Sequence, residues 1–153
     1  MVATVVMLDS GPLGLVTNPN PSATALACVR WLQTLALAGT RILIPEIADY
    51  EVRRELLRAN KQRGLQMLDV LARHAEFLPI TTPSMREAAR LWAVARQHGQ
   101  PTAGDNTIDG DMILAGQVLT LGVPGVVVAT TNVGHLSRFV LAELWPQIDP
   151  VVQ

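Results

Sequence analysis

Three carboxylates fall within seven residues, at Asp105, Asp109 and Asp111, and an apolar, small-residue run follows them directly. Asp commonly caps a helix because its side-chain oxygen accepts the free N–H groups of the first turn, where negative charge is also favoured. One interpretation is therefore a helix start with surplus acids. The other is that Asp111 faces inward as an oxygen ligand for a hard cation, which requires further carboxylates from distant parts of the chain.

Three other oxygen-bearing side chains lie at comparable places in separate segments. Asp9 directly follows the apolar run of residues 2–8, Glu51 lies in the first turns of a predicted helix, and Asn132 directly follows a later β-branched run. Ligands of open α/β sheets bind outside the carboxyl ends of the strands. We therefore expect these side chains to meet Asp111 at one sheet edge, although each alone could be a turn, cap or solvated helix residue.

Such a cluster would suit phosphodiester hydrolysis. This reaction needs a water that is deprotonated near neutral pH and a neutralised charge on the phosphate oxygens, and a divalent ion held by carboxylates can supply both. Clustered acids without a metal raise each other's pKa values, and a bound cation removes that repulsion. Asp109 and Ser10 could support the site.

The elements that must position these residues alternate between strand and helix. Strands are predicted over residues 2–8, 41–44, 77–80 and 126–130, and helices over residues 22–38, 47–59, a following segment to about 74, 82 to 98–99, 105 to 121–122 and 135–144. Residues 11–21 are predicted as a short segment rich in Gly, Pro and Asn, Thr82 as a helix cap, and residues 100–104 as a polar loop. This alternation predicts an α/β fold with a mainly parallel sheet.

Composition limits the class of protein. The 153 residues suit a single domain over 1–153, and 49% apolar with 16% charged residues argues against disorder. The single Cys28 allows no internal disulfide and fits a reducing cytoplasm. The run of residues 2–8 is too short to span a membrane and lacks a basic leader, so we expect no membrane association.

Charge is unevenly distributed although the formal net charge is only −1. Five basic residues occur in one short stretch: Arg53, Arg54, Arg58, Lys61 and Arg63. They could follow an RNA backbone beside the acidic site. They could equally form a solvated helix face that is partly paired with Glu51 and Glu55.

Four short motifs occur in a familiar order. They are V-V-M-L-D-S around Asp9, P-E-I-A-D-Y-E ending at Glu51, D-M-I-L-A-G-Q beginning at Asp111, and V-A-T-T-N ending at Asn132. Together they cover essentially the whole chain, which resembles a PIN domain of the kind found in the toxins of bacterial toxin–antitoxin modules. The resemblance implies a three-layer α/β/α sandwich with a mainly parallel central sheet.

The resemblance also implies an activity and partners. It implies a Mg²⁺- or Mn²⁺-dependent ribonuclease in which Asp9, Glu51 and Asp111 hold the metal and Asn132 assists. Arg53, Arg54 and Arg58 are then candidates for contact with the RNA backbone. An antitoxin-like inhibitory protein and a homodimer are the expected protein partners.

One residue departs from the family pattern, because many members have Asp where this chain has Asn132. Asn supplies a neutral oxygen in place of an anionic one. A PIN-like module that binds RNA or protein without cleaving is therefore an alternative. A metal-dependent phosphohydrolase of small molecules is a weaker one.

Overall fold

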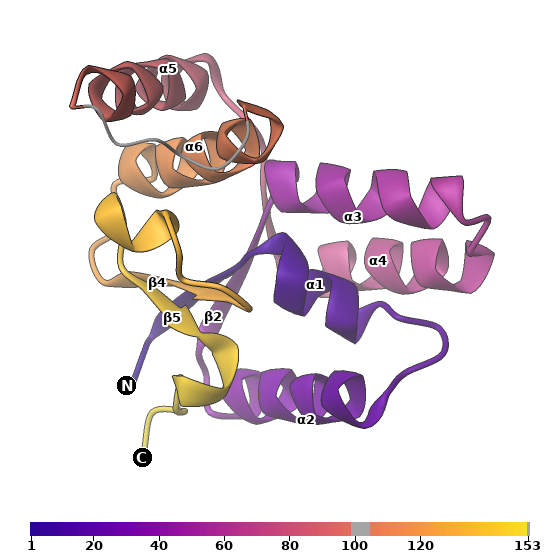
Figure 1. The fold of residues 1–153 in the computed structure, drawn as a ribbon. Helices are drawn as coiled ribbons and strands as arrows, with labels where there is room; N and C mark the ends of the chain where they lie inside the picture. Colours follow the sequence, from indigo (N-terminus) through magenta and orange to yellow (C-terminus); the bar gives the residue numbers. More distant parts are fainter. Residues whose placement is uncertain (99–104, 153) are drawn as a thin grey trace.

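A computed structural model of the chain describes residues 1–98 and 105–152, and the side chains of 1–98 and 109–152. Its strands form a five-stranded sheet with the order β3-β2-β1-β4-β5 (Figure 1). They are β1 (Val5–Leu8), β2 (Arg41–Pro45), β3 (Glu76–Leu78), β4 (Val126–Thr130) and β5 (Ala142–Leu144). All the neighbouring strands pair in parallel. The predicted mainly parallel sheet is confirmed.

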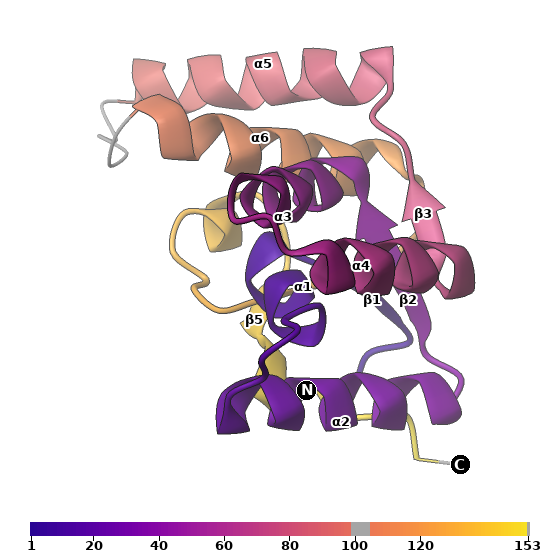
Figure 2. The same ribbon diagram turned by 90° about the vertical axis from the view of Figure 1, so that its right-hand side faces the viewer.

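Helices cover both faces of this sheet. They are α1 (Ser10–Val16), α2 (Ala23–Leu37), α3 (Glu46–Arg58), α4 (Gln62–His74), α5 (Thr82–Gln97) and α6 (Asp105–Thr120), with short 3₁₀ turns η1 (Leu136–Arg138) and η2 (Trp145–Gln147). Figures 1 and 2 show α5 and α6 on one side, and α1, α2 and α4 on the other. None of the described helices is long and apolar enough to cross a membrane.

The central strand β1 explains why the fold needs two cores. Successive strand residues point to opposite faces, so Val6 and Leu8 pack with α1 and α2, whereas Val5 and Met7 pack with α5 and α6. All four residues of β1 are buried, which accounts for its uninterrupted apolar sequence. Helix α3 contributes to both cores and so lies where the two helical layers meet.

Helix α1 was not predicted, because its sequence S-G-P-L-G-L-V contains two glycines and a proline. The helix forms because Asp9 caps it, accepting the N–H of Ser10. Pro12 is the third helical residue, and the first-turn N–H groups have no intrahelical partner, so proline costs little there. The caps of the other helices follow ordinary rules. Ser22 caps α2 as predicted, whereas α5 is capped by Thr81, one residue before the predicted Thr82.

The predicted helix over residues 135–144 is wrong. The structure has the short turn η1 there, followed by the edge strand β5. Strand β5 exists because its backbone pairs with β4, and the adjoining carbonyl of Leu141 accepts the N–H of Val128 at 2.9 Å. The predicted loop over residues 100–104 lies outside the described residues.

Candidate functional site

Asp9 stands directly after β1, and both of its carboxylate oxygens are held. The N–H of Ser10 donates to Oδ1 and the hydroxyl of Thr130 donates to Oδ2, each at 2.8 Å. Burial raises the pKa of Asp9, and these hydrogen bonds oppose the increase. The Thr130 hydroxyl also accepts the N–H of Asn132 at 3.1 Å. One buried hydroxyl therefore ties the end of β4 to the acid at the end of β1.

Glu51 reaches the site from α3 and lies against a glycine of α6. A Cβ atom built on Gly110 would stand 3.1 and 3.2 Å from the two carboxylate oxygens of Glu51. Glycine inside a helix costs about 1 kcal/mol relative to alanine, and here it leaves room for the carboxylate. Because Asp111 is the next residue, this contact also brings Asp111 towards Glu51.

The three acids affect one another electrostatically. The pKa of Asp111 is raised to about 6, first by burial and then by the charges of Asp9 and Glu51. The pKa of Glu51 is raised by burial and by the charge of Asp9, while Arg54 lowers it. The structure therefore brings together, at the carboxyl edge of the sheet, three acids that the sequence separates widely.

These carboxylates have the chemistry of a site for a hard cation, which binds oxygen ligands. Burial and the neighbouring negative charges disfavour the ionised form of each carboxylate, and a bound cation would favour it. In the described part of the chain, no Lys or Arg forms an ion pair with Asp9 or Asp111. Among the described side chains, no group of three or more His, Cys, Asp or Glu residues is already arranged to hold a metal ion. The donor set fits Mg²⁺ or Mn²⁺ in type and charge.

Of the predicted supporting residues, Asn132 is connected to the three acids and Asp109 is not. The side chain of Asn132 is exposed, and its backbone is linked to Asp9 through Thr130. Asp109 is exposed and lines a hollow between α5 and α6 together with Trp92. The structure therefore does not place Asp109 with the three acids.

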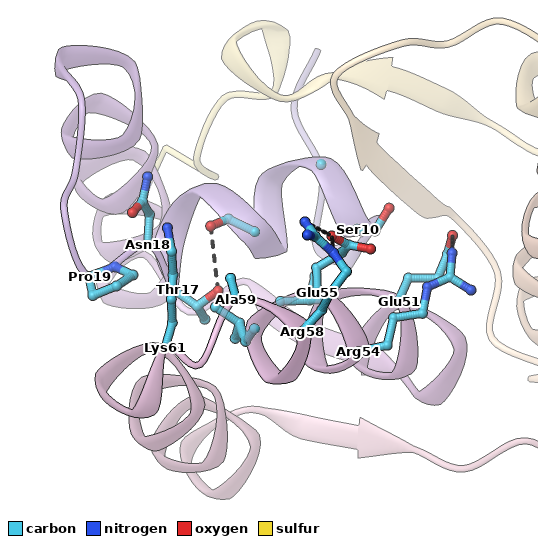
Figure 3. A pocket seen from close by; sticks show the side chains of 14 residues that line it. Ser10, Thr17, Asn18, Pro19, Glu51, Arg54, Glu55, Arg58, Ala59 and Lys61 are labelled. Carbon is cyan, nitrogen blue, oxygen red and sulfur yellow. Dashed lines mark hydrogen bonds and ion pairs between the residues drawn. The ribbon is translucent and has the colours of Figure 1, made fainter.

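A groove of about 490 Å³ leads away from the acids between α1 and α3, and we call it the α1–α3 groove. Its wall includes Ser10 and Glu51, and its charged or polar residues further along are Arg54, Glu55, Arg58, Lys61, Thr17 and Asn18. Figure 3 shows Glu51 and Arg54 towards one end of this groove, and Lys61 and Asn18 towards the other. The acidic site is thus open to an elongated ligand.

The three arginines that were candidates for RNA contact have different surroundings. Arg54 lies over the ring of Tyr50, 5.2 Å from its centre, and its Nη2 is 3.9 Å from Glu51 Oε2. Arg58 pairs with Glu55 at 2.8 Å on the exposed wall of the groove. Arg53 does not line the groove.

Arg53 instead ties α3 to α4. Its Nε and Nη2 donate to the two carboxylate oxygens of Asp49 at 2.9 and 3.2 Å, and Nη2 also donates to Asp69 of α4 at 2.8 Å. The side chain of Arg53 is 34% exposed, whereas Asp49 as a residue is only 8% exposed. A contact between Arg53 and RNA would have to compete with this network.

Thr130 and Gly110 were not assigned a role from the sequence. Thr130 lies in the V-A-T-T-N motif, so its position two residues before Asn132 could have drawn attention to it. Gly110 directly precedes Asp111 inside a helix, where a glycine is unfavourable. That cost is the only sequence signal of its contact with Glu51.

Comparison with known proteins identifies the fold. No protein-family model and no curated protein matches the sequence. A chain of FitAcB from Neisseria gonorrhoeae aligns with a TM-score of 0.66 at 19% identity, covering 93% of this chain and 99% of that one. DNA-bound VapBC from Salmonella typhimurium aligns with a TM-score of 0.62 at 21% identity, covering 95% and 99%. VapBC2 from Rickettsia felis, bound to a DNA fragment from its promoter, gives 0.65 at 16% identity, covering 92% and 98%.

At these identities the likeness shows the fold, over almost the whole length of each chain. The protein has the α/β/α fold of a PIN domain. The predicted fold class is therefore confirmed.

Proposed function

We propose that the protein is a metal-dependent RNA endonuclease with Asp9, Glu51 and Asp111 as metal ligands. The observation that carries the proposal is the meeting of three mutually repelling carboxylates at the carboxyl edge of a parallel sheet. Buried acids of this kind are stable when a cation neutralises them. Ligand sites of parallel α/β sheets also lie at this edge.

The chain's own residues prepare the site in three ways. Ser10 and Thr130 fix the direction of the Asp9 carboxylate, and Gly110 leaves room for the carboxylate of Glu51. Asp111, whose pKa is about 6, is mostly ionised at neutral pH and binds a proton below that value. A bound Mg²⁺ or Mn²⁺ would help to deprotonate a water and would neutralise negative charge on the phosphate. Because a proton on Asp111 competes with the metal, activity at sub-saturating metal should fall as the solution is acidified.

A cleavage assay tests this function. Purified protein is incubated with a mixed RNA pool in Mn²⁺, in Mg²⁺ or in EDTA, and the products are separated on a denaturing gel. We expect cleavage with either metal, none with EDTA, and none for Asp9→Asn in any condition. Metal-independent cleavage, or full activity of Asp9→Asn, would contradict the proposal.

A binding module that engages RNA or protein without cleaving is the second candidate. The observation that favours it is Asn132, whose neutral and exposed side chain stands where many PIN domains have an acid. Asn132→Asp separates the two functions. A wild-type protein that binds RNA but does not cleave, together with an Asn132→Asp variant that cleaves in Mn²⁺, would support the binding module.

An antitoxin-like inhibitory protein and a second copy of the chain are the proposed protein partners, and the cytoplasm is the proposed location. The sequence motifs resemble toxins of toxin–antitoxin modules, and the fold is shared with VapBC and FitAcB structures. Light scattering of the purified protein tests the homodimer. An inhibitor is tested by expressing the protein with and without its neighbouring open reading frame. Growth arrest that occurs only without the neighbour supports this partner, and growth that is equal in both strains argues against it.

A further inference from the structure

We infer that the α1–α3 groove binds the phosphodiester backbone of a single RNA strand beside the bond that is cleaved, with Arg54 nearest to the acids and Lys61 at the far end. This inference deepens the proposed function and rests on it for the chemistry at Glu51. Its new content is a binding track in which Arg58 and Lys61 contact phosphates and Arg53 does not.

The groove has the right connection to the acidic site. It begins beside Ser10 and Glu51, which belong to that site or adjoin it, and continues between α1 and α3 to Asn18 and Lys61. Figure 3 shows these residues along one hollow. A strand whose scissile phosphate lies at the acids can therefore continue into the groove without leaving the surface.

Basic side chains recur along the α3 wall at helical spacing. Arg54 and Arg58 are four residues apart, so they lie on the same face of α3, and Lys61 follows just beyond the end of the helix. The distance along the helix axis from Glu51 to Arg58 is about 10 Å, at about 1.5 Å per residue. Each phosphate of a stacked strand advances by about 3.4 Å along the strand axis and lies further than that from its neighbour through space, so a wall of this length can face more than one phosphate before Lys61.

These basic groups are available to phosphate. Arg58 pairs with Glu55, but their side chains are 73% and 59% exposed, and pairs of that kind are weak and easily exchanged. Within the described residues, Lys61 has no ion pair. Arg53, by contrast, already donates to Asp49 and Asp69. The basic residues of α3 therefore fall into two groups. Arg54 and Arg58 line the groove, whereas Arg53 is held by Asp49 and Asp69.

The lining also indicates how the strand is recognised. No aromatic side chain occurs among the described residues that line the groove, so it offers no stacking platform for bases. Lysine and arginine contacts to phosphate carry no sequence information. The groove should therefore hold RNA strands of any sequence, and the choice of cleavage site would depend on contacts elsewhere.

Binding in EDTA tests the groove separately from cleavage. The probe is a fluorescein-labelled oligouridylate of twelve nucleotides, whose anisotropy is titrated at several salt concentrations. The test variant is the double substitution Arg58→Gln with Lys61→Gln. The control is Arg30→Gln with Arg73→Gln, which removes the same charge from exposed sites on α2 and α4.

We expect the groove variant to bind about tenfold more weakly at 0.1 M salt, and its slope of log affinity against log salt to fall by about 1.4. The control should match the wild type in both. Equal losses in the two variants, no loss in the groove variant, or no binding by the wild type would overturn the inference.

The outcomes also separate this inference from the proposed function. Groove-dependent binding without metal-dependent cleavage would overturn the function and leave the binding track in place. Cleavage by the groove variant with an unchanged KM for the same oligonucleotide would overturn the track and leave the function in place.

Discussion

Helix α3 carries two acids only two residues apart, and their surroundings differ sharply. Asp49 is buried against Arg53, which binds both of its carboxylate oxygens and also reaches Asp69. Glu51 faces Asp9 and Asp111, and its own cation, Arg54, is 3.9 Å away. In the first cluster the protein supplies a matching positive charge. In the second, three negative charges lie together, and the one ion pair of these acids among the described residues is the longer contact between Glu51 and Arg54.

This difference separates a structural cluster from a candidate metal site. A buried carboxylate is costly unless it is paired, and the Asp49 network shows that this fold can provide an arginine where stability is the purpose. The acids around Glu51 have raised pKa values instead. The proposed function accounts for this difference, because a bound Mg²⁺ or Mn²⁺ would supply positive charge to this cluster.

The largest expected effect is the loss of cleavage when an acid of the second cluster is neutralised. Asp9→Asn, Glu51→Gln and Asp111→Asn should each lower kcat by about 100-fold or more, and pairs of them should cost little more, because residues that act as a unit are not additive. Asp69→Asn, from the structural network, is the matched control and should change kcat less than twofold. Substantial cleavage by Glu51→Gln would mean that the acids around Glu51 are no more important for activity than those around Arg53.

The second prediction concerns stability and applies to the structural cluster. Asp49→Asn should lower the free energy of unfolding by about 1–3 kcal/mol, because it leaves the partly buried Arg53 without its main partner. Asp69→Asn should cost less than about 1 kcal/mol, because Asp69 is mostly exposed. Urea unfolding measures both. Equal losses of unfolding free energy in the two variants, or a loss of Mn²⁺ binding in Asp49→Asn, would contradict the structural role of Asp49.

The third prediction uses pH on the metal-free protein. The folded pKa of Asp111, about 6, lies above its ordinary value of 3.8. The folded state therefore holds this proton more tightly than the unfolded state, so the carboxyl destabilises the fold increasingly as the pH rises from about 4 to 6, and fully above that. In EDTA, Asp111→Asn should be more stable than the wild type by about 1–3 kcal/mol at pH 7.5.

That advantage should disappear near pH 4, where the wild-type carboxyl is protonated in both states. Urea unfolding at the two pH values is the measurement. A variant that is less stable than the wild type at pH 7.5, with and without metal, would contradict this prediction and leave Asp111 as an ordinary helix acid.

The smallest expected effect comes from Gly110. Alanine there favours the helix by up to about 1 kcal/mol, but its Cβ would push the Glu51 carboxylate by a few tenths of an ångström. Gly110→Ala should therefore keep or raise the melting temperature and lower kcat several-fold. Gly122→Ala is unsuitable as a control because its φ is +73°. Ala115→Gly in the same helix reverses the change and should lower stability without a comparable fall in kcat per folded molecule.

Much of the fold could be predicted because local pattern and tertiary position agree. The apolar run of β1, the β-branched run of β4 and the cap Ser22 each had one consistent interpretation. Helix α1 was missed because its glycines and proline favour a loop, and only the cap at Asp9 and burial of its apolar face explain the helix. Strand β5 was missed because three residues show no periodicity, and the strand exists through pairing with β4.

The candidate site also has features that local sequence predicts and features that depend on contacts between distant segments. The positions of Asp9, directly after β1, and of Asn132, two residues after β4, could be predicted from the apolar runs that precede them. Ligand sites of parallel sheets lie at that edge. The bond from Thr130 to Asp9 and the contact of Gly110 with Glu51 join segments that are distant in the sequence, so no local pattern encodes them. The role of Arg53 depended on which way α4 faces, which only the packed structure shows.

Isothermal titration of the apo protein with Mn²⁺ tests the central claim most directly. We predict saturable binding to the wild type, a large loss of affinity in Asp9→Asn and in Asp111→Asn, and unchanged binding in Asp69→Asn. The same titration at pH 5 should show weaker binding than at pH 7.5, because protons compete for Asp111. Absence of Mn²⁺ binding by the wild type at millimolar concentration, or equal binding by all four proteins, would contradict the claim that these acids bind a divalent cation.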